Sequence, residues 1–390
     1  MKQNKFKIII SGGGSGGHIF PAIAIANALK KNNNNIEILF VGAKNKMEMN
    51  KVPAAGYNIK GLWISGLQRR LSLKNLSFPF KVLLSMIKAK KIIKNFKPDA
   101  VIGTGGYASG PILKIATNKK IPTLIQEQNS FPGITNRLLA KHVNKICVAY
   151  NNMDNFFPKS KIVLTGNPIR QEFVNFEHKK EKALEYFNLS KHKKTLLVIG
   201  GSLGAKTINE SIHKNLMAFI HNDIQILWQT GNSYFDIAKQ YAQNIDDNVI
   251  KVYEFITKMD YAYASADIIV SRAGAIAVSE LCALGKPAIL IPSPNVAEDH
   301  QTKNAMALVN KNAAIIIKDN EAKKKLNKTI IDLLNNQKQQ TELQNNISKM
   351  AFKNSADLIA EEIINMIGQH INEPTPKRQN YVIPNLFRNL

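Results

Sequence analysis

Residues 11–21 of this chain read S-G-G-G-S-G-G-H-I-F-P. An apolar run at 6–10 precedes this stretch, and a helical pattern at 19–31 follows it. A strand, a glycine-rich loop and a helix in this order bring backbone N–H groups and a helix N-terminus to one point, which attracts an anion such as a phosphate. The five glycines within 12–17 let a ligand approach the backbone closely, because no Cβ intervenes. The stretch therefore predicts an anion site, with His18 where the helix begins.

Apolar runs continue beyond this stretch and alternate with helical patterns. The runs that predict strands in the first half lie at 36–41, 98–103, 121–125 and 145–149. Residues 44–74 hold several turn signals and are expected to be irregular. The alternation predicts an α/β fold with a doubly wound parallel sheet. Because ligands bind at the carboxyl ends of such strands, we expect the loops at 11–18, 103–111 and 126–133 to cluster at one edge.

The second half repeats the order of strand, glycine loop and helix. The apolar run at 195–199 leads into G-G-S-L-G-A-K-T at 200–207, and T-G-N-P-I-R at 165–170 suits a hinge. Further strands are expected at 224–228, 249–252, 268–270, 288–291 and 314–317. Two doubly wound domains with an active site in the cleft between them are the natural architecture. The last helical pattern ends near Gly368, and 369–390 looks like a loosely ordered tail.

Composition limits the class of protein. A chain of 390 residues with 44% hydrophobic and 21% charged residues is typical of a globular protein with two domains. Its two cysteines, Cys147 and Cys282, lie in apolar runs, which argues against a disulfide framework or a cysteine metal site. No signal-peptide pattern follows the basic N-terminus, and no run of apolar residues is long enough to predict a transmembrane helix.

The net charge of +25 permits three interpretations. Nucleic-acid binding is the weakest, because the chain has no recognisable motif for it and aromatic residues make up only 7%. We therefore expect no nucleic-acid partner. Attraction to an anionic membrane surface and a merely solvated, lysine-rich surface both remain open.

An amphipathic segment at 75–94 raises the same question. Its apolar residues Leu76, Phe80, Leu83, Leu84 and Ile87 follow a helical period, many lysines accompany them, and Arg69 and Arg70 stand just before. Such a helix either lies in a membrane interface or, more commonly, packs its apolar face on its own sheet.

Two glycine-rich motifs resemble cofactor-binding sequences, but other residues that those cofactors require are missing. Gly12, Gly14 and Gly17 satisfy G-x-G-x-x-G, but no acid stands at the end of the second strand to hold a nicotinamide ribose. The stretch at 200–207 resembles a phosphate-binding P-loop, but Ala205 replaces its last glycine. We therefore expect no dinucleotide cofactor and no ATPase activity.

Glu280 and a group of polar residues at 298–300 remain ambiguous from the residues alone. Glu280 lies in an apolar helical stretch, where it is either solvated on an exposed stripe or accepts hydrogen bonds from a sugar diol in the cleft. Glu298, Asp299 and His300 form the only close group of potential metal ligands, although a polar loop is the commoner explanation for such a group. No metal is expected.

Seven stretches, in order along residues 5–368, resemble the peptidoglycan glycosyltransferase family that adds N-acetylglucosamine to lipid I and so makes lipid II. They read G-G-G-S-G-G-H-I-F-P (12–21), G-T-G-G-Y-A-S-G-P (103–111), E-Q-N-S-F-P-G (127–133), T-G-N-P-I-R (165–170), G-G-S-L-G-A (200–205), R-A-G-A-I-A-V-S-E (272–280) and D-H-Q-T-K-N-A (299–305). One such motif is weak support, but seven in order are strong.

The resemblance implies a GT-B fold, with two Rossmann-like domains facing a cleft. Residues 1–166 would form the acceptor- and membrane-facing domain and 167–349 the UDP-sugar domain, while a helix at 350–368 would return to the first domain. The implied reaction is an inverting transfer from UDP-α-N-acetylglucosamine to the 4-hydroxyl of the muramoyl sugar, which gives a β-1,4 link without a cofactor.

The resemblance also implies the residues that hold the donor. They match here as Ser15, Gly16, Gly17, Asn129, Arg170, Ser202, Ile256, Ala275, Ile276, Ala277, Val278, Ser279, Glu280 and Gln301. In this assignment Glu280 would hold the ribose hydroxyls, Ile256 the uracil through its backbone, and Gln301 the sugar hydroxyls.

An inverting transfer needs a base for the acceptor proton and positive potential for the departing UDP. His18 is the candidate base, since the start of a helix favours the neutral imidazole that can accept a proton. Its alternative role is only to hold the glycine loop or a phosphate. Arg170 and the helix N-termini can supply the positive potential. Arg272 either contacts the diphosphate or only packs.

The implied partners are the UDP-N-acetylglucosamine donor, the lipid I acceptor and an anionic membrane surface. Because a polyprenyl tail keeps lipid I in the bilayer, the resemblance implies peripheral association with the cytoplasmic face of the bacterial inner membrane. It also favours the membrane interpretation of 75–94. Competing hypotheses are a GT-B glycosyltransferase with another acceptor and a nucleotide-sugar-binding protein without turnover.

Overall fold

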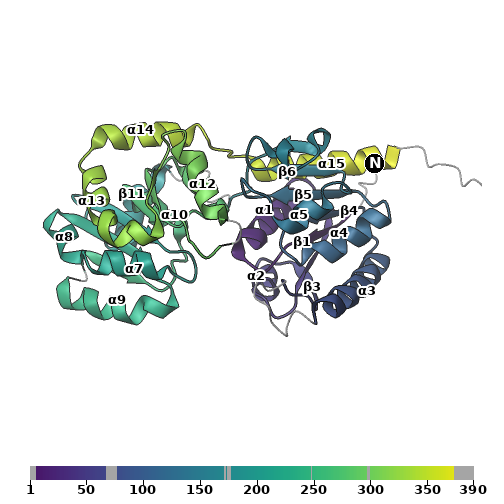
Figure 1. The fold of residues 1–390 in the computed structure, drawn as a ribbon, viewed down its shortest axis with the longest axis horizontal. Helices are drawn as coiled ribbons and strands as arrows, with labels where there is room; N and C mark the ends of the chain where they lie inside the picture. The colour runs from purple at the N-terminus through teal and green to yellow at the C-terminus, as the bar shows by residue number, and fades with distance from the viewer. Residues whose placement is uncertain are drawn as a thin grey trace, which may run out of the picture.

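The computed structural model describes residues 6–66, 77–170, 173, 177–246, 248–296 and 299–372. Figure 1 shows two lobes side by side, each built around one parallel sheet with helices on its faces. This arrangement confirms the expected pair of doubly wound domains. Leu76, Arg69, Arg70, Glu298 and the end of the tail from residue 373 lie outside the described residues.

The first lobe holds a seven-stranded sheet in the order β3-β2-β1-β4-β5-β6-β7. Its strands are β1 (Lys7–Ser11), β2 (Glu37–Ala43), β3 (Asn58–Leu62), β4 (Ala100–Gly103), β5 (Thr123–Glu127), β6 (Lys145–Val148) and β7 (Ile162–Leu164). Its helices are α1 (Gly16–Asn32), α2 (Glu48–Ala54), α3 (Phe78–Phe96), α4 (Ser109–Asn118) and α5 (Ile134–Leu139). Helices on both faces explain the uninterrupted apolar run Ile8, Ile9 and Ile10, all of which are buried.

The second lobe holds a six-stranded sheet in the order β10-β9-β8-β11-β12-β13. Its strands are β8 (Lys194–Ile199), β9 (Ile224–Gln229), β10 (Ile250–Tyr253), β11 (Ile268–Ser271), β12 (Ala288–Leu290) and β13 (Ile315–Ile316). Its helices are α6 (Lys180–Tyr186), α7 (Lys206–His213), α8 (Leu216–His221), α9 (Asn232–Ile245), α10 (Met259–Ser265), α11 (Ala275–Leu284), α12 (His300–Val309), α13 (Ala322–Leu334) and α14 (Gln337–Ser348). Strand order reverses beside β1 in one lobe and beside β8 in the other, so each glycine loop follows the strand at a switch point.

The last helix, α15 (Ser355–Asn372), lies on the first lobe (Figure 1). Its buried residues Ile359 and Ile363 belong to the same core cluster as Ile19 and Ile25 of α1. The helix runs four residues past the expected end at Gly368, because no proline follows until residue 374 and a single glycine does not stop a packed helix.

Residues 44–74 are not irregular throughout, contrary to the expectation from their turn signals. They contain α2, with Pro53 in its last turn, and β3, with Gly61 inside the strand. Both residues usually mark turns, but the neighbouring strand β2 supplies the hydrogen-bond ladder that holds β3 in place. Tertiary pairing therefore overrides the local signal. The short edge strand β7 was likewise not expected.

Helix α3 exposes the apolar stripe that its period indicates. Phe80 is 69% exposed, and Leu83 and Ile87 are each 59% exposed. The helix instead packs through a second face that contains Ala89 and Ile92. The alternative in which the stripe packs on its own sheet is therefore wrong for the described residues. No helix in the described ranges is long and apolar enough to cross a membrane.

Candidate active site

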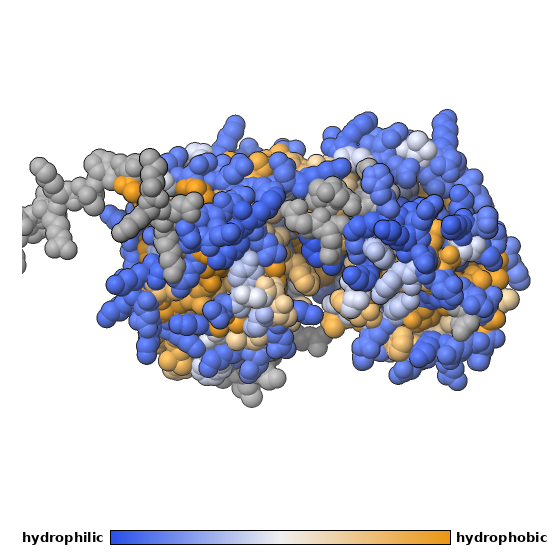
Figure 2. All heavy atoms as spheres, turned by 180° about the vertical axis from the view of Figure 1, so that it is seen from behind, coloured by the Kyte–Doolittle hydropathy of each residue, from blue (hydrophilic) through white to orange (hydrophobic). Residues whose placement is uncertain are grey.

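The three expected loops of the first lobe meet at the carboxyl edge of the sheet, as predicted. His18 of α1 contacts the carbonyl oxygen of Thr104, after β4, and the side chain of Gln128, after β5. Figure 2 shows the surface hollowed between the two lobes.

The hydrogen bonds of His18 determine which ring nitrogen carries the proton. Its Nδ1 lies 3.0 Å from the carbonyl oxygen of Thr104 and 3.1 Å from Oε1 of Gln128. Both partners are acceptors, so Nδ1 must carry the hydrogen in the neutral ring, and Nε2 keeps its lone pair. His18 therefore has the tautomer that a base acting through Nε2 requires.

The glycines after β4 leave room for this imidazole. A Cβ at Gly105 would lie only 2.9 Å from Nδ1 of His18, and Gly105 and Gly106 have φ angles of +94° and +78°. A side chain at either position would meet both backbone strain and a clash. The second glycine loop thus forms a wall for His18.

A buried acid that the sequence did not indicate lies beneath the first glycine loop. Glu48 accepts hydrogen bonds from the backbone N–H of Ala43 (2.9 Å) and of Gly14 (3.2 Å), and it is 0% exposed. This carboxylate already accepts the hydrogen bond of one N–H group in the loop, and it would repel an anion that binds there. The loop is therefore a poorer anion site than its glycines alone predict. Of the predicted donor residues here, Ser15 and Gly17 are exposed and Gly16 is half-buried.

A pocket of about 500 Å³ lies at the matching edge of the second lobe. The glycine loop at 200–207 forms one side of the pocket, and α11 and α12 contribute to the other. Ser202, Ala277 and Gln301 of the predicted donor residues line it. The carboxamide oxygen of Gln301 accepts from the backbone N–H of Ser293 at 2.9 Å, so the –NH2 end is its donating group.

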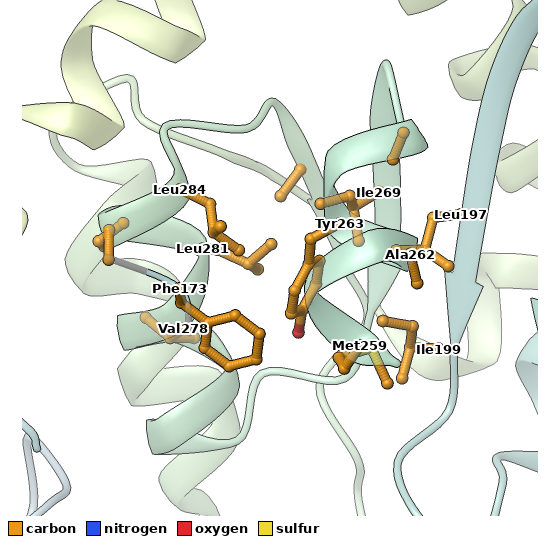
Figure 3. Close-up of a cluster of buried hydrophobic side chains, with 14 of the residues drawn as sticks. Phe173, Leu197, Ile199, Met259, Ala262, Tyr263, Ile269, Val278, Leu281 and Leu284 are labelled. Carbon is orange, nitrogen blue, oxygen red and sulfur yellow. The ribbon is translucent and has the colours of Figure 1, made fainter. Parts of the chain in front are cut away.

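Glu280 is held in a polar cluster rather than solvated. It is 7% exposed, its Oε1 lies 3.5 Å from Nη2 of Arg170, and its Oε2 accepts from the hydroxyl of Tyr263 at 3.1 Å. Burial and the neighbouring Glu280 raise the pKa of Tyr263 well above its usual value, so the phenol stays a donor. The Tyr263 ring lies among apolar side chains, including Phe173, as Figure 3 shows. The interpretation of Glu280 as a solvated residue is therefore wrong.

The side chains of the other residues in segment 275–280 lie on different faces of α11 and have different surroundings. The side chain of Val278 packs in the apolar cluster of Figure 3. The hydroxyl of Ser279 accepts from Nδ2 of Asn167, in the segment 165–170 that joins the two lobes, at 3.0 Å. Ala275 is buried and Ile276 is half-buried in the first turn of the helix. Apart from Ala277, this segment presents mainly its helix N-terminus to the pocket.

Gln229, at the end of β9, contacts both the segment of Ile256 and the glycine loop at 200–207, two segments that are predicted to hold the sugar nucleotide. Its Oε1 accepts the backbone N–H of Ile256 at 2.9 Å, and its Nε2 donates to the carbonyl oxygen of Gly201 at 3.0 Å. Because the N–H of Ile256 already donates to Gln229, the carbonyl of Ile256 is the backbone group suited to accept a hydrogen bond from a nucleobase. Gln229 was not expected, since only the fold brings it beside both loops.

The two lobes contact each other through α12. Oδ1 of Asn304 accepts from the backbone N–H and the hydroxyl of Ser130, both at 3.2 Å, and Nδ2 of Asn304 lies 3.3 Å from Oδ1 of Asn129. Asn304 follows Gln301 by one helical turn. Asn129 is thus placed at the helix that carries Gln301, although it belongs to the other lobe.

Arg272 packs rather than pointing freely at the pocket that it borders. Its Nη1 lies 2.5 Å from Oδ1 of Asp319 and 3.0 Å from the carbonyl oxygen of Ile291.

Cys147 and Cys282 are both buried, and burial raises the pKa of each thiol to about 12. Neither thiol is therefore available as a thiolate nucleophile near neutral pH.

Comparison with known proteins matches both lobes to one family. The N-terminal domain of glycosyltransferase family 28 matches residues 8–148, and the C-terminal domain of the same family matches residues 195–362. Among solved structures, MurG from Acinetobacter baumannii aligns with 92% of this chain and 99% of its own, at a TM-score of 0.74 and 28% identity. UDP-GlcNAc 2-epimerase from Neisseria meningitidis shares the fold, at a TM-score of 0.66 and 16% identity.

Relatives of known name are similar over nearly their whole length. A protein from Cytophaga hutchinsonii is 54% identical, with 94% of this chain and 98% of its own covered. Another from Flavobacterium psychrophilum is 53% identical, with 94% and 99% covered. Both are named UDP-N-acetylglucosamine--N-acetylmuramyl-(pentapeptide) pyrophosphoryl-undecaprenol N-acetylglucosamine transferase. With both of its lobes matched, this chain belongs to glycosyltransferase family 28 and is a hexosyltransferase of the GT-B fold.

Proposed function

We propose that this chain transfers N-acetylglucosamine from UDP-N-acetylglucosamine to the 4-hydroxyl of the muramoyl sugar of lipid I, with inversion, and so forms lipid II for peptidoglycan synthesis. The observation that carries this proposal is the arrangement of His18, whose Nδ1–H is held by two acceptors at the carboxyl edge of the first sheet. The names of the relatives supply the identity of both substrates.

The donor would bind mainly to the second lobe. Glu280, held by Tyr263, would accept hydrogen bonds from the ribose hydroxyls, and the carbonyl of Ile256 would contact the uracil. The –NH2 group of Gln301 would donate to a hydroxyl of the sugar. Ser202 and the N-terminus of α11 line the same pocket as Gln301 and would receive the diphosphate.

The chemistry needs one proton acceptor and stabilisation of one leaving group. Nε2 of His18 would take the proton of the acceptor hydroxyl as that oxygen attacks the anomeric carbon, and the bond from this carbon to UDP breaks on the opposite side. Arg170, whose guanidinium lies over the ring of Phe173, would neutralise the charge that develops on the diphosphate.

A transfer assay with purified full-length protein, UDP-N-acetylglucosamine and a lipid I analogue tests this function. The expected products are UDP and a disaccharide lipid in equal amounts. Release of UDP without a disaccharide lipid would indicate another acceptor. Donor binding without any turnover would indicate a nucleotide-sugar-binding protein instead.

Helix α3 would be the contact with the membrane in which lipid I resides. Its exposed apolar stripe of Phe80, Leu83 and Ile87 is accompanied by exposed lysines such as Lys90 and Lys91. Apolar side chains would enter the interface while lysines attract anionic lipid. The chain would then lie peripherally on the cytoplasmic face of the inner membrane.

Changing Leu83 and Ile87 together to serine should weaken binding to vesicles that contain phosphatidylglycerol by about tenfold or more, because two apolar side chains no longer enter the interface. Co-sedimentation with vesicles measures this binding. A matched control changes Met217 and Ile237, two exposed apolar residues of the second lobe, to serine and should bind normally. Equal weakening in both variants, or binding of the wild type that does not fall at high salt, would contradict the proposal.

A further inference from the structure

A continuous series of hydrogen bonds leads from His18 across the hinge to helix α11. His18 bonds to Gln128 (3.1 Å), Gln128 bonds to Gln126, and Gln126 bonds to Asn167 (2.9 Å). Asn167 then bonds to the hydroxyl of Ser279 in the second domain at 3.0 Å. Four hydrogen bonds thus separate the candidate base from the helix that borders the donor pocket.

Every donor in this series points the same way. Nδ1–H of His18 donates to Oε1 of Gln128, and Nε2 of Gln128 donates to Oε1 of Gln126. Nε2 of Gln126 donates to Oδ1 of Asn167, and Nδ2 of Asn167 donates to Oγ of Ser279. The hydroxyl of Ser279 donates in turn to the carbonyl oxygen of Ala275, at 3.0 Å. Hydrogen bonds aligned in one direction polarise and strengthen one another.

This direction determines how each side-chain amide is turned. A carboxamide has one accepting and one donating end, so each amide must present its oxygen to the previous member and its –NH2 to the next. Gln126, Gln128 and Asn167 are all buried. Nε2 of Gln128 also donates to the carbonyl of Thr104 (2.7 Å), and Nδ2 of Asn167 to the carbonyl of Gln128 (2.9 Å).

We propose that Gln126 and Asn167 are positioning residues that keep the oxygen of Gln128 turned toward His18, and that Ser279 of the second domain completes this series. The proposal rests on the proposed function of His18 as the base. Asn167 lies in the segment at 165–170 that joins the two lobes, and its bond to Ser279 ties this segment to α11. The tautomer of the base is thereby coupled to the seating of the donor helix against the first domain.

Breaking the series weakens the preference of His18 for the Nδ1–H tautomer. Without the acceptor at Gln126, the –NH2 of Gln128 keeps only the carbonyl of Thr104 as partner, and a turned amide would bring this –NH2 toward Nδ1 of His18. Nδ1 would then face a donor beside its one remaining acceptor, the carbonyl of Thr104, so the Nε2–H tautomer, which lacks the lone pair for the proton of the acceptor hydroxyl, gains population. The substitution acts on the base without removing any group that touches the donor.

Replacing Gln126 with methionine, which has nearly the same size, tests this coupling in the full-length protein. We expect kcat for lipid II formation to fall about tenfold or more, with the KM for UDP-N-acetylglucosamine changed less than about threefold. In protein labelled with ¹⁵N-histidine, the Nδ1 and Nε2 signals of His18 should shift away from the Nδ1–H pattern. The His18→Ala spectrum identifies these signals among those of the eight histidines.

Two further variants separate this role from a general effect on folding. Gln225 is a buried glutamine of β9 that donates to the carbonyl of Ser190 at 2.8 Å. Gln225→Met should leave the His18 signals and the kcat unchanged. Ser279→Ala removes only the last acceptor and preserves the helix, since alanine favours helices. It should move the His18 signals in the same direction as Gln126→Met, although Ser279 lies in the other domain.

Unchanged ¹⁵N signals of His18 in folded Gln126→Met and Ser279→Ala proteins would overturn the proposal, as would an equal response in Gln225→Met. The failure of the base assignment has a different signature. In that case His18→Ala would keep a near-normal kcat, while the ¹⁵N signals of the Gln126 and Ser279 variants could still report the coupling.

Discussion

Replacing His18 with alanine should lower kcat by about 100-fold or more, because the acceptor hydroxyl then has no positioned base. The KM for UDP-N-acetylglucosamine should change much less, since the pocket proposed for the donor lies in the second lobe. Steady-state kinetics with a lipid I analogue, with each substrate varied in turn, separate the two constants.

A matched control for this variant is His142→Ala, which removes an exposed histidine of the same lobe. It should retain wild-type kinetics. A His18→Ala enzyme with near-normal kcat would remove the imidazole from the mechanism and leave it the structural role of holding the loops after β1, β4 and β5. A raised KM for the donor with unchanged kcat would assign His18 to donor binding instead.

Glu280→Gln should raise the KM for UDP-N-acetylglucosamine by about 10- to 100-fold, because hydrogen bonds to a charged group contribute about 1.5–3 kcal/mol. The amide keeps the size of the side chain but loses the charge and one of the two acceptors. Tyr263→Phe, which removes only the hydroxyl that orients Glu280 at 3.1 Å, should have a smaller effect in the same direction.

A donor analogue without the ribose 2′-hydroxyl makes this prediction specific. If Glu280 holds both ribose hydroxyls, the analogue should bind more weakly to the wild type, and Glu280→Gln should cost it less affinity than it costs the natural donor, because only the 3′-hydroxyl contact is left to lose. Tyr261→Phe, on the same helix as Tyr263, is the matched control and should leave the KM unchanged. An equal loss of affinity for both donors in Glu280→Gln would show that Glu280 does not act through the 2′-hydroxyl.

Much of the fold follows from local patterns. The runs before the two glycine loops predict β1 and β8, and the repeated order of strand, loop and helix predicts two doubly wound domains. The clustering of three loops at one edge followed from topology alone, because parallel strands present their carboxyl ends together. The same patterns failed for α2 and β3, where Pro53 and Gly61 imitate turns.

The contacts of the residues that complete the site could not be predicted from local sequence patterns. Glu280 could be singled out from its apolar neighbours, but its pairing with Arg170 joins positions 110 residues apart. Glu48 lies close in sequence to β2, yet nothing in the local pattern directs its carboxylate under the first glycine loop. Gln229 likewise escaped notice, because its two contacts lie on separate loops.

The amino-acid pattern was enough to indicate the parallel sheets, the two-domain order, the two glycine-rich loops after β1 and β8, and His18 as the candidate base. These features depend on periodicity and on residues adjacent in the chain. Only the tertiary structure decided the tautomer of His18, the contacts of Glu280 and the hydrogen bond between Asn167 and Ser279. His18 and Gln128 are 110 residues apart, and Asn167 and Ser279 are 112 residues apart. No sequence period encodes such separations, because the partners become neighbours only when the sheets and the hinge have assembled.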